Sequence, residues 1–355
     1  MHMKTFQCSC GQDLFFDNSM CLRCQAKLGF CPACYSIAPL LPQPDGSWRC
    51  GHPACNVRLA LCHNYRMYDV CNRCVLWPDA GIAEVYCDCC RYNYTIPDLS
   101  VAGNIEKWGR LEAAKRRLFY DLDLLRLPRG TRADGVHPPL SFDFKADDIP
   151  ATDMWWTAGS AERVYTGHSK GHITINIMEA DEVERVRLRV DLGEAHRTLI
   201  GHFRHEIGHY YWDVFIKGQL EPAFEILFGS PYEPAYDIAL EQYYAQGPAA
   251  NWSSAYISAY ASMHPWEDWA ETFAFYLDMV SALDTAAHNG LMTRSLACFE
   301  SMEKMAMAYQ RLGVGLNEMS RTLGLIDMVP EVITQRVLEK LDFIYARCPP
   351  IAVAG

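Results

Sequence analysis

One stretch near the middle of the chain alternates apolar and polar positions with the period of an α-helix. Leu199, Phe203 and Ile207 begin an apolar face that Tyr210 and Val214 continue. Polar side chains that end in imidazole or carboxylate groups occupy the opposite face. Because residues three and four apart share one side of a helix, the pattern predicts an amphipathic helix with one side buried.

Periodic stretches elsewhere predict a mixed α+β chain. Alternation with period two predicts strands, and apolar residues three and four apart predict helices. On the first helix, Lys115, Arg116 and Arg117 are expected to form a solvated face. The expected strands are residues 140–144 and 164–177, and the expected helices are residues 104–127, 220–228, 235–244, one opening at Pro265, and a tail from residue 281 that is helical throughout except for a break at Pro330.

The length and net charge of the chain limit its domain number and its partners. The chain has 355 residues, 50% of them hydrophobic, which is enough for two domains. We place them at residues 1–100 and 101–355, with a linking helix at residues 104–127. A net charge of −11 disfavours nucleic acid and anionic membranes as partners. The sequence has no bilayer-spanning apolar run and no signal-peptide pattern, so a cytoplasmic location is expected.

Cysteines are concentrated at the start of the chain. Fourteen of the sixteen lie between Cys8 and Cys90, many of them in C-x-x-C pairs. In a cytoplasmic protein such pairs suit tetrahedral zinc better than disulfides. Residues 1–100 are therefore predicted to form small β-hairpins around zinc, which replaces a core too small to be stable alone. Two sets of four close locally: Cys8, Cys10, Cys21 and Cys24, and then Cys31, Cys34, Cys50 and Cys55.

A third cysteine set has two solutions on spacing alone. A site closed by four thiolates keeps no open coordination position, so a structural role is favoured for all three sets. The alternatives for the third are Cys71, Cys74, Cys87 and Cys90, or Cys62, Cys71, Cys87 and Cys90 with Cys74 and Cys89 left over.

The polar face of the central helix carries the motif H-E-x-x-H at His205, Glu206 and His209. Two imidazoles four residues apart can bind one metal ion, and the glutamate beside them can reach a water molecule on that ion. Catalytic zinc takes three protein ligands and keeps one position open. The motif provides two of the three, so another residue must complete the set.

The third ligand is expected on the helix that opens at Pro265. Glu267 and Glu271 share one face of that helix. Glu267 is predicted to bind the metal, and Glu271 to accept a hydrogen bond that orients a histidine. Asp268 and His264 are the alternatives to Glu267.

Three other side chains near the motif are weighed as parts of the site. Asp213, one turn after His209, is expected to hold a ligand imidazole. His168 and His172 lie on the strand that precedes the motif helix, which could edge an active cleft. Ordinary surface histidines are the simpler interpretation of both.

Five runs of residues resemble bacterial zinc-binding metallopeptidases with an N-terminal zinc ribbon. The resemblance covers essentially the whole chain and implies an α+β fold, in which the ribbon module precedes a mainly helical, zincin-like domain. It also implies that Cys62, Cys71, Cys87 and Cys90 form the third zinc site. The runs are residues 8–24, 90–99, 171–177, 201–212 and 264–273.

A more distant similarity to lethal-factor-like peptidases implies further roles. In those enzymes the third ligand opens an E-x-x-x-E helix, and a tyrosine seven residues earlier assists at the oxyanion. The matching positions here are Glu267 and Tyr260. The implied catalytic residues are Glu206 as general base, Tyr260 and Glu271.

The leading hypothesis is a gluzincin-like, zinc-dependent metallopeptidase that hydrolyses peptide or related amide bonds. It implies one catalytic and about three structural Zn²⁺ ions. Its partner is a peptide or protein substrate, and the ribbon module is open to a protein partner. Two rival classes are a zinc-ribbon adaptor with an inert zincin domain and a hydrolase of non-peptide amides.

Overall fold

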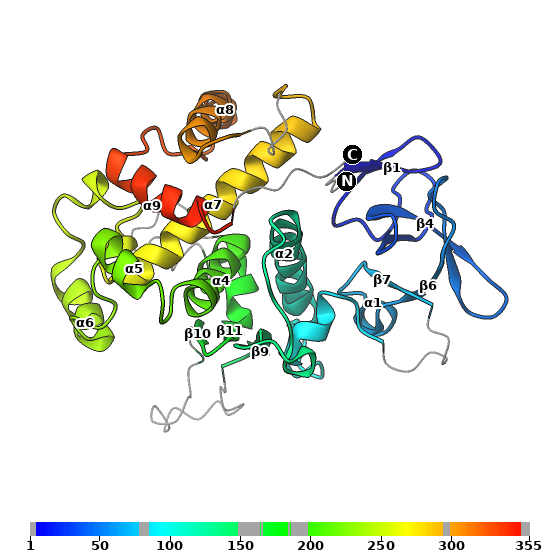
Figure 1. Cartoon of the computed structure of the whole chain (residues 1–355). Helices are drawn as coiled ribbons and strands as arrows, with labels where there is room; N and C mark the ends of the chain where they lie inside the picture. Colours follow the sequence, from blue (N-terminus) through cyan, green and yellow to red (C-terminus); the bar gives the residue numbers. More distant parts are fainter. Residues whose placement is uncertain are drawn as a thin grey trace. The chain divides into compact units, whose positions relative to one another are not determined.

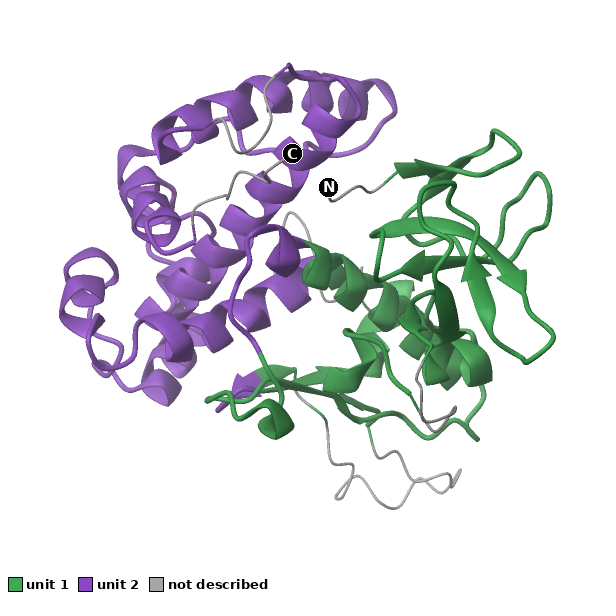
Figure 2. Cartoon of the chain, turned by 45° about the vertical axis from the view of Figure 1, so that its right-hand side comes forward, with its two compact units in different colours: residues 1–120, 130–167, 172–200 green, residues 121–129, 168–171, 201–355 purple. Residues whose placement is uncertain are grey.

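The computed structural model describes residues 5–77, 85–147, 164, 166–183, 185, 198–293 and 299–348. The chain divides into two compact units (Figure 2). Unit 1 comprises residues 1–120, 130–167 and 172–200, and unit 2 comprises residues 121–129, 168–171 and 201–355. Residues on both sides of position 100 thus belong to unit 1, so the units divide the chain at other points than the predicted domains.

The N-terminal part of unit 1 is built from short antiparallel strands (Figure 1). β1 pairs with β2, and a five-stranded sheet has the order β3-β4-β5-β6-β7. β3 and β4 bury most of their side chains, but strands this short form only a small core, so further interactions must hold them. The elements are β1 (Thr5–Gln7), β2 (Asp13–Phe15), β3 (Leu28–Cys31), β4 (Ser36–Pro42), β5 (Trp48–Cys50), β6 (Arg58–Leu61), α1 (His63–Tyr68) and β7 (Cys74–Leu76).

A long helix and a second sheet follow, and most of their residues belong to unit 1. The sheet has the order β10-β11-β9-β8, and β9 pairs in parallel with both β8 and β11. The expected strand at residues 164–177 is two strands, because Lys170 and Gly171 form a turn with positive φ. The elements are η1 (Cys90–Tyr92), β8 (Asn93–Thr95), α2 (Asn104–Leu124), η2 (Arg132–Asp134), β9 (Ser141–Lys145), β10 (Gly167–Ser169), β11 (His172–Asn176) and η3 (Ile177–Ala180).

The basic patch of α2 is largely buried, so the expected solvated face is wrong. Lys115 is fully buried and donates to Glu112 Oε1 over 3.0 Å. The buried Arg116 donates to the carbonyl oxygen of Val70 over 2.8 Å. Burying a cation is costly unless it is paired, and both side chains have partners. Only Arg117, whose side chain is 41% exposed, meets the expectation.

Unit 2 is mainly helical, and α5, α8 and α9 pack against α7. The C-terminal tail is not helical throughout, because Gly324 (φ +73°) follows α8 and Pro330 lies in the connection to α9. Among the helices described, none combines the length and apolarity that a membrane span requires. The elements are α4 (Leu199–Phe215), α5 (Glu221–Phe228), α6 (Tyr236–Gln246), η4 (Trp252–Ser254), η5 (Tyr260–Ser262), α7 (Pro265–His288), α8 (Met302–Thr322) and α9 (Gln335–Tyr345).

A buried ion pair joins α9 to the first turn of α7. Lys340 Nζ lies 2.6 Å from Asp268 Oδ2, and the two side chains are 3% and 0% exposed. Lys340 also donates to the carbonyl oxygen of Ala255 over 2.7 Å. Burial raises the pKa of Asp268 to about 7, although Lys340 opposes the shift. The pair therefore fixes the end of α7 that lies next to the predicted third ligand.

We predict that Lys340→Met lowers the free energy of unfolding by about 3 kcal/mol, because it leaves a buried carboxyl group without its cation. Chemical denaturation followed by circular dichroism measures the change. Lys304→Met is the matched control, since the Lys304–Glu300 pair is exposed and should contribute at most about 1 kcal/mol. Equal losses in the two variants would contradict the prediction.

Candidate metal centre and cysteine clusters

The metal centre depends on a close crossing of α4 and α7. Gly208, inside the H-E-x-x-H motif, has no side chain, and a Cβ there would lie only 3.0 Å from the Cα of Ala270. The two backbones can therefore approach where any other residue would separate them. Trp269 Nε1 donates to the carbonyl oxygen of Gly208 over 2.8 Å and adds a direct bond between the helices.

The crossing brings three predicted ligands to one point. His205 and His209 lie one turn apart on α4, and their Nε2 atoms are 3.2 Å apart. Glu267 comes from the first turn of α7. Its Oε2 lies 3.0 Å from His205 Nε2, and its Oε1 lies 3.5 Å from His209 Nε2.

These separations fit a tetrahedral zinc ion. Donors bound about 2.0–2.1 Å from zinc are about 3.3 Å from one another. Glu267 Oε2 has no hydrogen-bond donor among the described residues, as a ligand atom requires. Burial raises the pKa of Glu267, but His209 and His205 bring it well below its usual range, which favours the anionic carboxylate. The residues present therefore suit zinc, with three protein ligands.

Glu271 orients the first histidine. His205 Nδ1 donates to Glu271 Oε1 over 2.7 Å, which leaves the lone pair of Nε2 directed at the metal centre. Ser258 Oγ donates to the other oxygen of Glu271 over 2.7 Å. Ser258 was not predicted, because its role depends on the loop before α7 and on no local motif.

Glu206 lies beside these ligands, and no Lys or Arg of the described residues forms an ion pair with it. It is 7% exposed, and its Oε2 has no hydrogen-bond partner among the described residues. Burial raises the pKa of its carboxyl group, while the neighbouring His205 and His209 oppose the shift. A buried carboxylate with a free oxygen is suited to take up a proton.

Two tyrosines reach the centre, of which the sequence indicated one. Tyr260 lies with its ring 6.1 Å from that of His205. Tyr236, the first residue of α6, donates its hydroxyl hydrogen to Glu267 Oε1 over 2.9 Å. Burial raises the pKa of both tyrosine hydroxyls, and the neighbouring Glu267 and Tyr236 add to the shift at Tyr260. Tyr236 is 31 residues from Glu267, and no motif linked them.

The alternatives to Glu267 have other partners. His264 caps α7, where its Nδ1 accepts a hydrogen bond from the backbone nitrogen of Trp266 over 3.1 Å. Asp268 is bound to Lys340. Of the three candidates, only Glu267 lies with His205 and His209 in a group of described side chains that could hold a metal ion.

Of the three other candidate side chains, only that of His168 contacts a predicted metal ligand. Asp213 pairs with Lys217 over 3.1 Å rather than with a ligand imidazole. The ring of His168 stacks on that of His209 with 6.3 Å between centroids. His172 instead bonds to Asp143, with its Nε2 2.6 Å from Asp143 Oδ2. His168 thus belongs to the metal centre's surroundings and His172 to the sheet of unit 1.

Among the described residues of unit 1, cysteine thiols gather in three groups. Sulfur atoms bound about 2.3 Å from a tetrahedral zinc ion are about 3.8 Å apart. The Sγ–Sγ distance is 3.7 Å for Cys8–Cys24, and 3.9 Å for Cys71–Cys87. The groups are Cys8, Cys10, Cys21 and Cys24; Cys31, Cys34, Cys50 and Cys55; and Cys62, Cys71, Cys87 and Cys90.

Cys74 and Cys89 are buried but belong to none of these groups. The third group therefore follows the arrangement that the family resemblance implied, and not the two C-x-x-C pairs taken alone. Cys298 lies outside the described residues.

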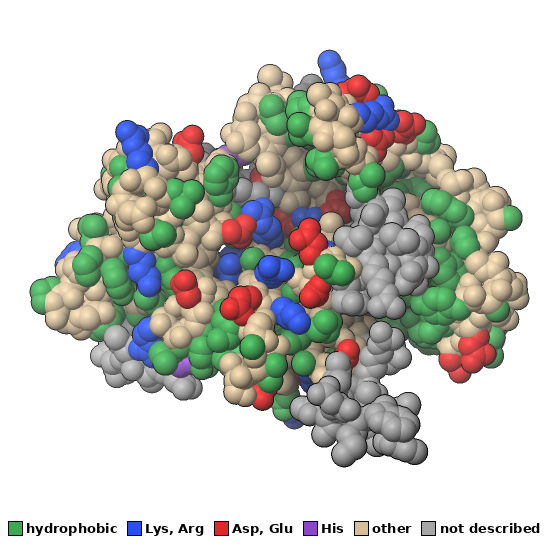
Figure 3. All heavy atoms as spheres, turned by 180° about the vertical axis from the view of Figure 1, so that it is seen from behind, with side chains coloured by type: hydrophobic (Ala, Val, Ile, Leu, Met, Phe, Trp, Pro, Cys, Tyr) green, Lys and Arg blue, Asp and Glu red, His purple; other side chains and the backbone are tan. Residues whose placement is uncertain are grey.

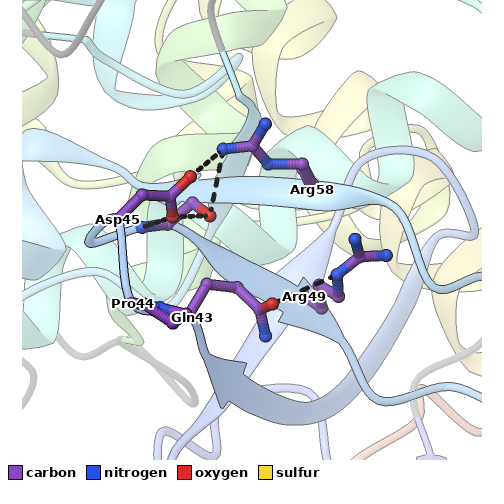
Figure 4. A pocket seen from close by; sticks show the side chains of 6 residues that line it. Gln43, Pro44, Asp45, Arg49 and Arg58 are labelled. Atoms are coloured by element: carbon purple, nitrogen blue, oxygen red, sulfur yellow. Dashed lines mark hydrogen bonds and ion pairs between the residues drawn. The ribbon is translucent and has the colours of Figure 1, made fainter.

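The ribbon also has a small pocket of about 310 Å³ beside the turn between β4 and β5 (Figure 4). Its charged groups have partners within the pocket: Arg58 pairs with Asp45, and Arg49 Nε donates to the amide oxygen Oε1 of Gln43 over 3.3 Å. None of the predicted ligands or catalytic residues lines it, and we assign it no function. The lining residues are Gln43, Pro44, Asp45, Ser47, Arg49 and Arg58.

Comparison with known proteins gives the family. A family model described as "Putative zinc-binding metallo-peptidase" matches residues 104–347, and one described as "zinc-ribbon domain" matches residues 5–101. The chain belongs to this zinc-binding metallo-peptidase family, with a zinc ribbon at its N-terminus. The resemblance and the α+β fold class expected from the sequence are thereby confirmed.

Similar proteins occur in mycobacteria. Uncharacterized proteins of Mycobacterium bovis and of two strains of Mycobacterium tuberculosis are each 35% identical to this chain over 364 residues. The matches cover 99% of this chain and 96% of each relative. No solved structure matches the chain significantly.

The membership of the third cysteine group can be tested by metal counting. We predict that Cys71→Ser lowers the zinc content by at least one ion per chain, because three thiolates close the site poorly. Inductively coupled plasma mass spectrometry on the purified protein measures this content. In the control Cys74→Ala the content should be unchanged. Loss of zinc from that variant would instead favour the site built on Cys74.

Proposed function

We propose that this protein is a zinc-dependent peptidase whose catalytic ion is held by His205, His209 and Glu267. Bound zinc lowers the pKa of a water molecule and polarises a carbonyl group. One observation carries the proposal: the three donor groups converge beside Glu206, which is buried and has an unpaired oxygen among the described residues. Structural zinc sites are closed by four protein ligands, so this three-ligand arrangement favours catalysis.

Glu206 is the proposed general base. It takes a proton from the attacking water and passes it to the leaving amine, which makes the amine a better leaving group. Burial raises the pKa of Glu206, and this shift brings the carboxyl group closer to the pH at which proton transfer in both directions is efficient. Glu271 and Ser258 hold His205 in its binding tautomer through the hydrogen-bond chain described above.

A second candidate is an adaptor that binds a protein through the ribbon. It is favoured by large apolar side chains that the ribbon exposes, among them Phe15 (60%), Leu22 (77%) and Leu76 (56%). On the face shown in Figure 3, basic and acidic side chains are interspersed, and the net charge is −11; neither feature favours nucleic acid. An adaptor role requires no proton acceptor at Glu206, so the variant below separates the two candidates.

We predict that Glu206→Gln leaves the zinc content unchanged and lowers hydrolysis by about 10²–10⁴-fold, since glutamine cannot accept the proton. The assay uses casein and a random peptide library, with mass spectrometry of the products. Glu225→Gln, on the exposed part of α5, is the control and should keep wild-type activity.

Full activity of Glu206→Gln would rule out the mechanism. If the wild-type protein cleaves no peptide but hydrolyses small amides, and this activity also depends on Glu206, then the protein is a non-peptide amide hydrolase. If neither peptides nor small amides are hydrolysed, the result favours the adaptor function.

A further inference from the structure

Two tyrosines lie at the metal centre, and the scheme above gives neither a role. We propose that Tyr236 is a catalytic residue that donates its hydroxyl hydrogen to the oxyanion formed during amide hydrolysis, and that Tyr260 is a positioning residue for Tyr236. The inference rests on the proposed peptidase function. It differs from the sequence-based expectation, which gave the oxyanion role to Tyr260.

The hydroxyl of Tyr236 is already at the site of the reaction. It lies 2.9 Å from Glu267 Oε1, an atom of the predicted third ligand. A substrate oxygen that approaches the three ligands also comes within reach of this hydroxyl. The Tyr236 hydroxyl then donates to the developing oxyanion instead of to Glu267 Oε1. Because the oxyanion gains negative charge as the reaction proceeds, this hydrogen bond is stronger in the transition state than in the ground state.

The ring of Tyr236 is held in place by α7. It contacts the ring of His264 edge-on at 5.3 Å between centroids and that of Trp266 at 6.2 Å. Trp266 in turn packs on the ligand His209 at 4.8 Å. Tyr236 nevertheless remains 38% exposed, so a substrate can reach it. A donor that is held and accessible is what electrostatic stabilisation of an oxyanion requires.

Tyr260 supports this donor and lies one step further from the ligands. Its ring lies 6.1 Å from that of His205, and the ring of Tyr243 packs against it edge-on at 5.7 Å. Burial, Glu267 and the neighbouring Tyr236 hydroxyl raise the pKa of Tyr260. A phenol has one hydrogen to donate and also accepts. When Tyr260 donates to the oxygen of Tyr236, the hydrogen of Tyr236 stays directed at the metal centre. Loss of Tyr260 should therefore act only through Tyr236.

The test is a double-mutant cycle on the zinc-loaded full chain. We predict that Tyr236→Phe lowers kcat by about 100-fold with KM nearly unchanged, because only transition-state binding is lost. Tyr260→Phe should lower kcat by less, and the double variant should equal Tyr236→Phe alone. Tyr244→Phe, 62% exposed on the same helix, is the matched control and should match wild type. Zinc content is measured in every variant.

Ligand binding provides a readout that does not need turnover. Acetohydroxamate places an anionic oxygen at a zinc ion, whereas the thiolate of 2-mercaptoethanol offers no oxygen there. By calorimetry, Tyr236→Phe should weaken acetohydroxamate by about 10-fold and leave the thiol unaffected, because a hydrogen bond to a charged acceptor is lost.

Wild-type kcat in Tyr236→Phe, equal weakening of both ligands, or additive effects of the two substitutions would each overturn the inference. Such a result is distinct from failure of the peptidase proposal. If the peptidase proposal is wrong, Glu206→Gln keeps full activity. If only the present inference is wrong, Glu206→Gln is inactive while Tyr236→Phe keeps wild-type activity.

Discussion

The backbone contact between α4 and α7 at Gly208 is the constraint on which the metal centre depends. A Cβ at this position would meet the Cα and the carbonyl oxygen of Ala270 at 3.0 and 3.1 Å, and backbone atoms cannot rotate away. An alanine here would require the two backbones to separate by a few tenths of an ångström, and a longer side chain would require more, which would draw Glu267 away from His205 and His209. Their donor atoms lie only 3.0–3.5 Å apart, so even a shift of about 1 Å would spoil a tetrahedral set.

The elements around this contact restrict its movement further. On α4, the side chain of Arg204 bonds to Asp121 over 2.6 Å and pairs with Asp278 of α7. The apolar sides of the two helices pack through fully buried rings, such as those of Tyr211 and Phe273, stacked at 5.3 Å between centroids. The packed apolar sides of α4 and α7 thus hold the ligand side chains on their polar sides in a geometry suited to a metal ion.

How far the site follows from the sequence depends on which contacts define each residue's role. The spacing of His205 and His209 fixes their common face, since a helix brings positions four apart together wherever it lies. Tyr236 and Ser258 act through partners on α7 that no local pattern identifies. The predicted solvated face at Lys115 is wrong for the same reason. Its spacing from Glu112 predicts an ion pair on one face of a helix, but no local pattern shows that other elements pack over that face.

The charge of the third cysteine group accounts for one buried cation of α2, Arg116, whereas Lys115 pairs with Glu112. Zinc with four thiolates carries a net charge of −2, and all four cysteines of this group are buried, unlike those of the other two. A buried anion needs a counter-charge. Burial lowers the pKa of Arg116, but Cys71 raises it, and Arg73 experiences a similar effect from its anionic neighbours. Arg116 therefore lies where it can offset the negative charge that the thiolates of this group would carry when they hold a metal ion.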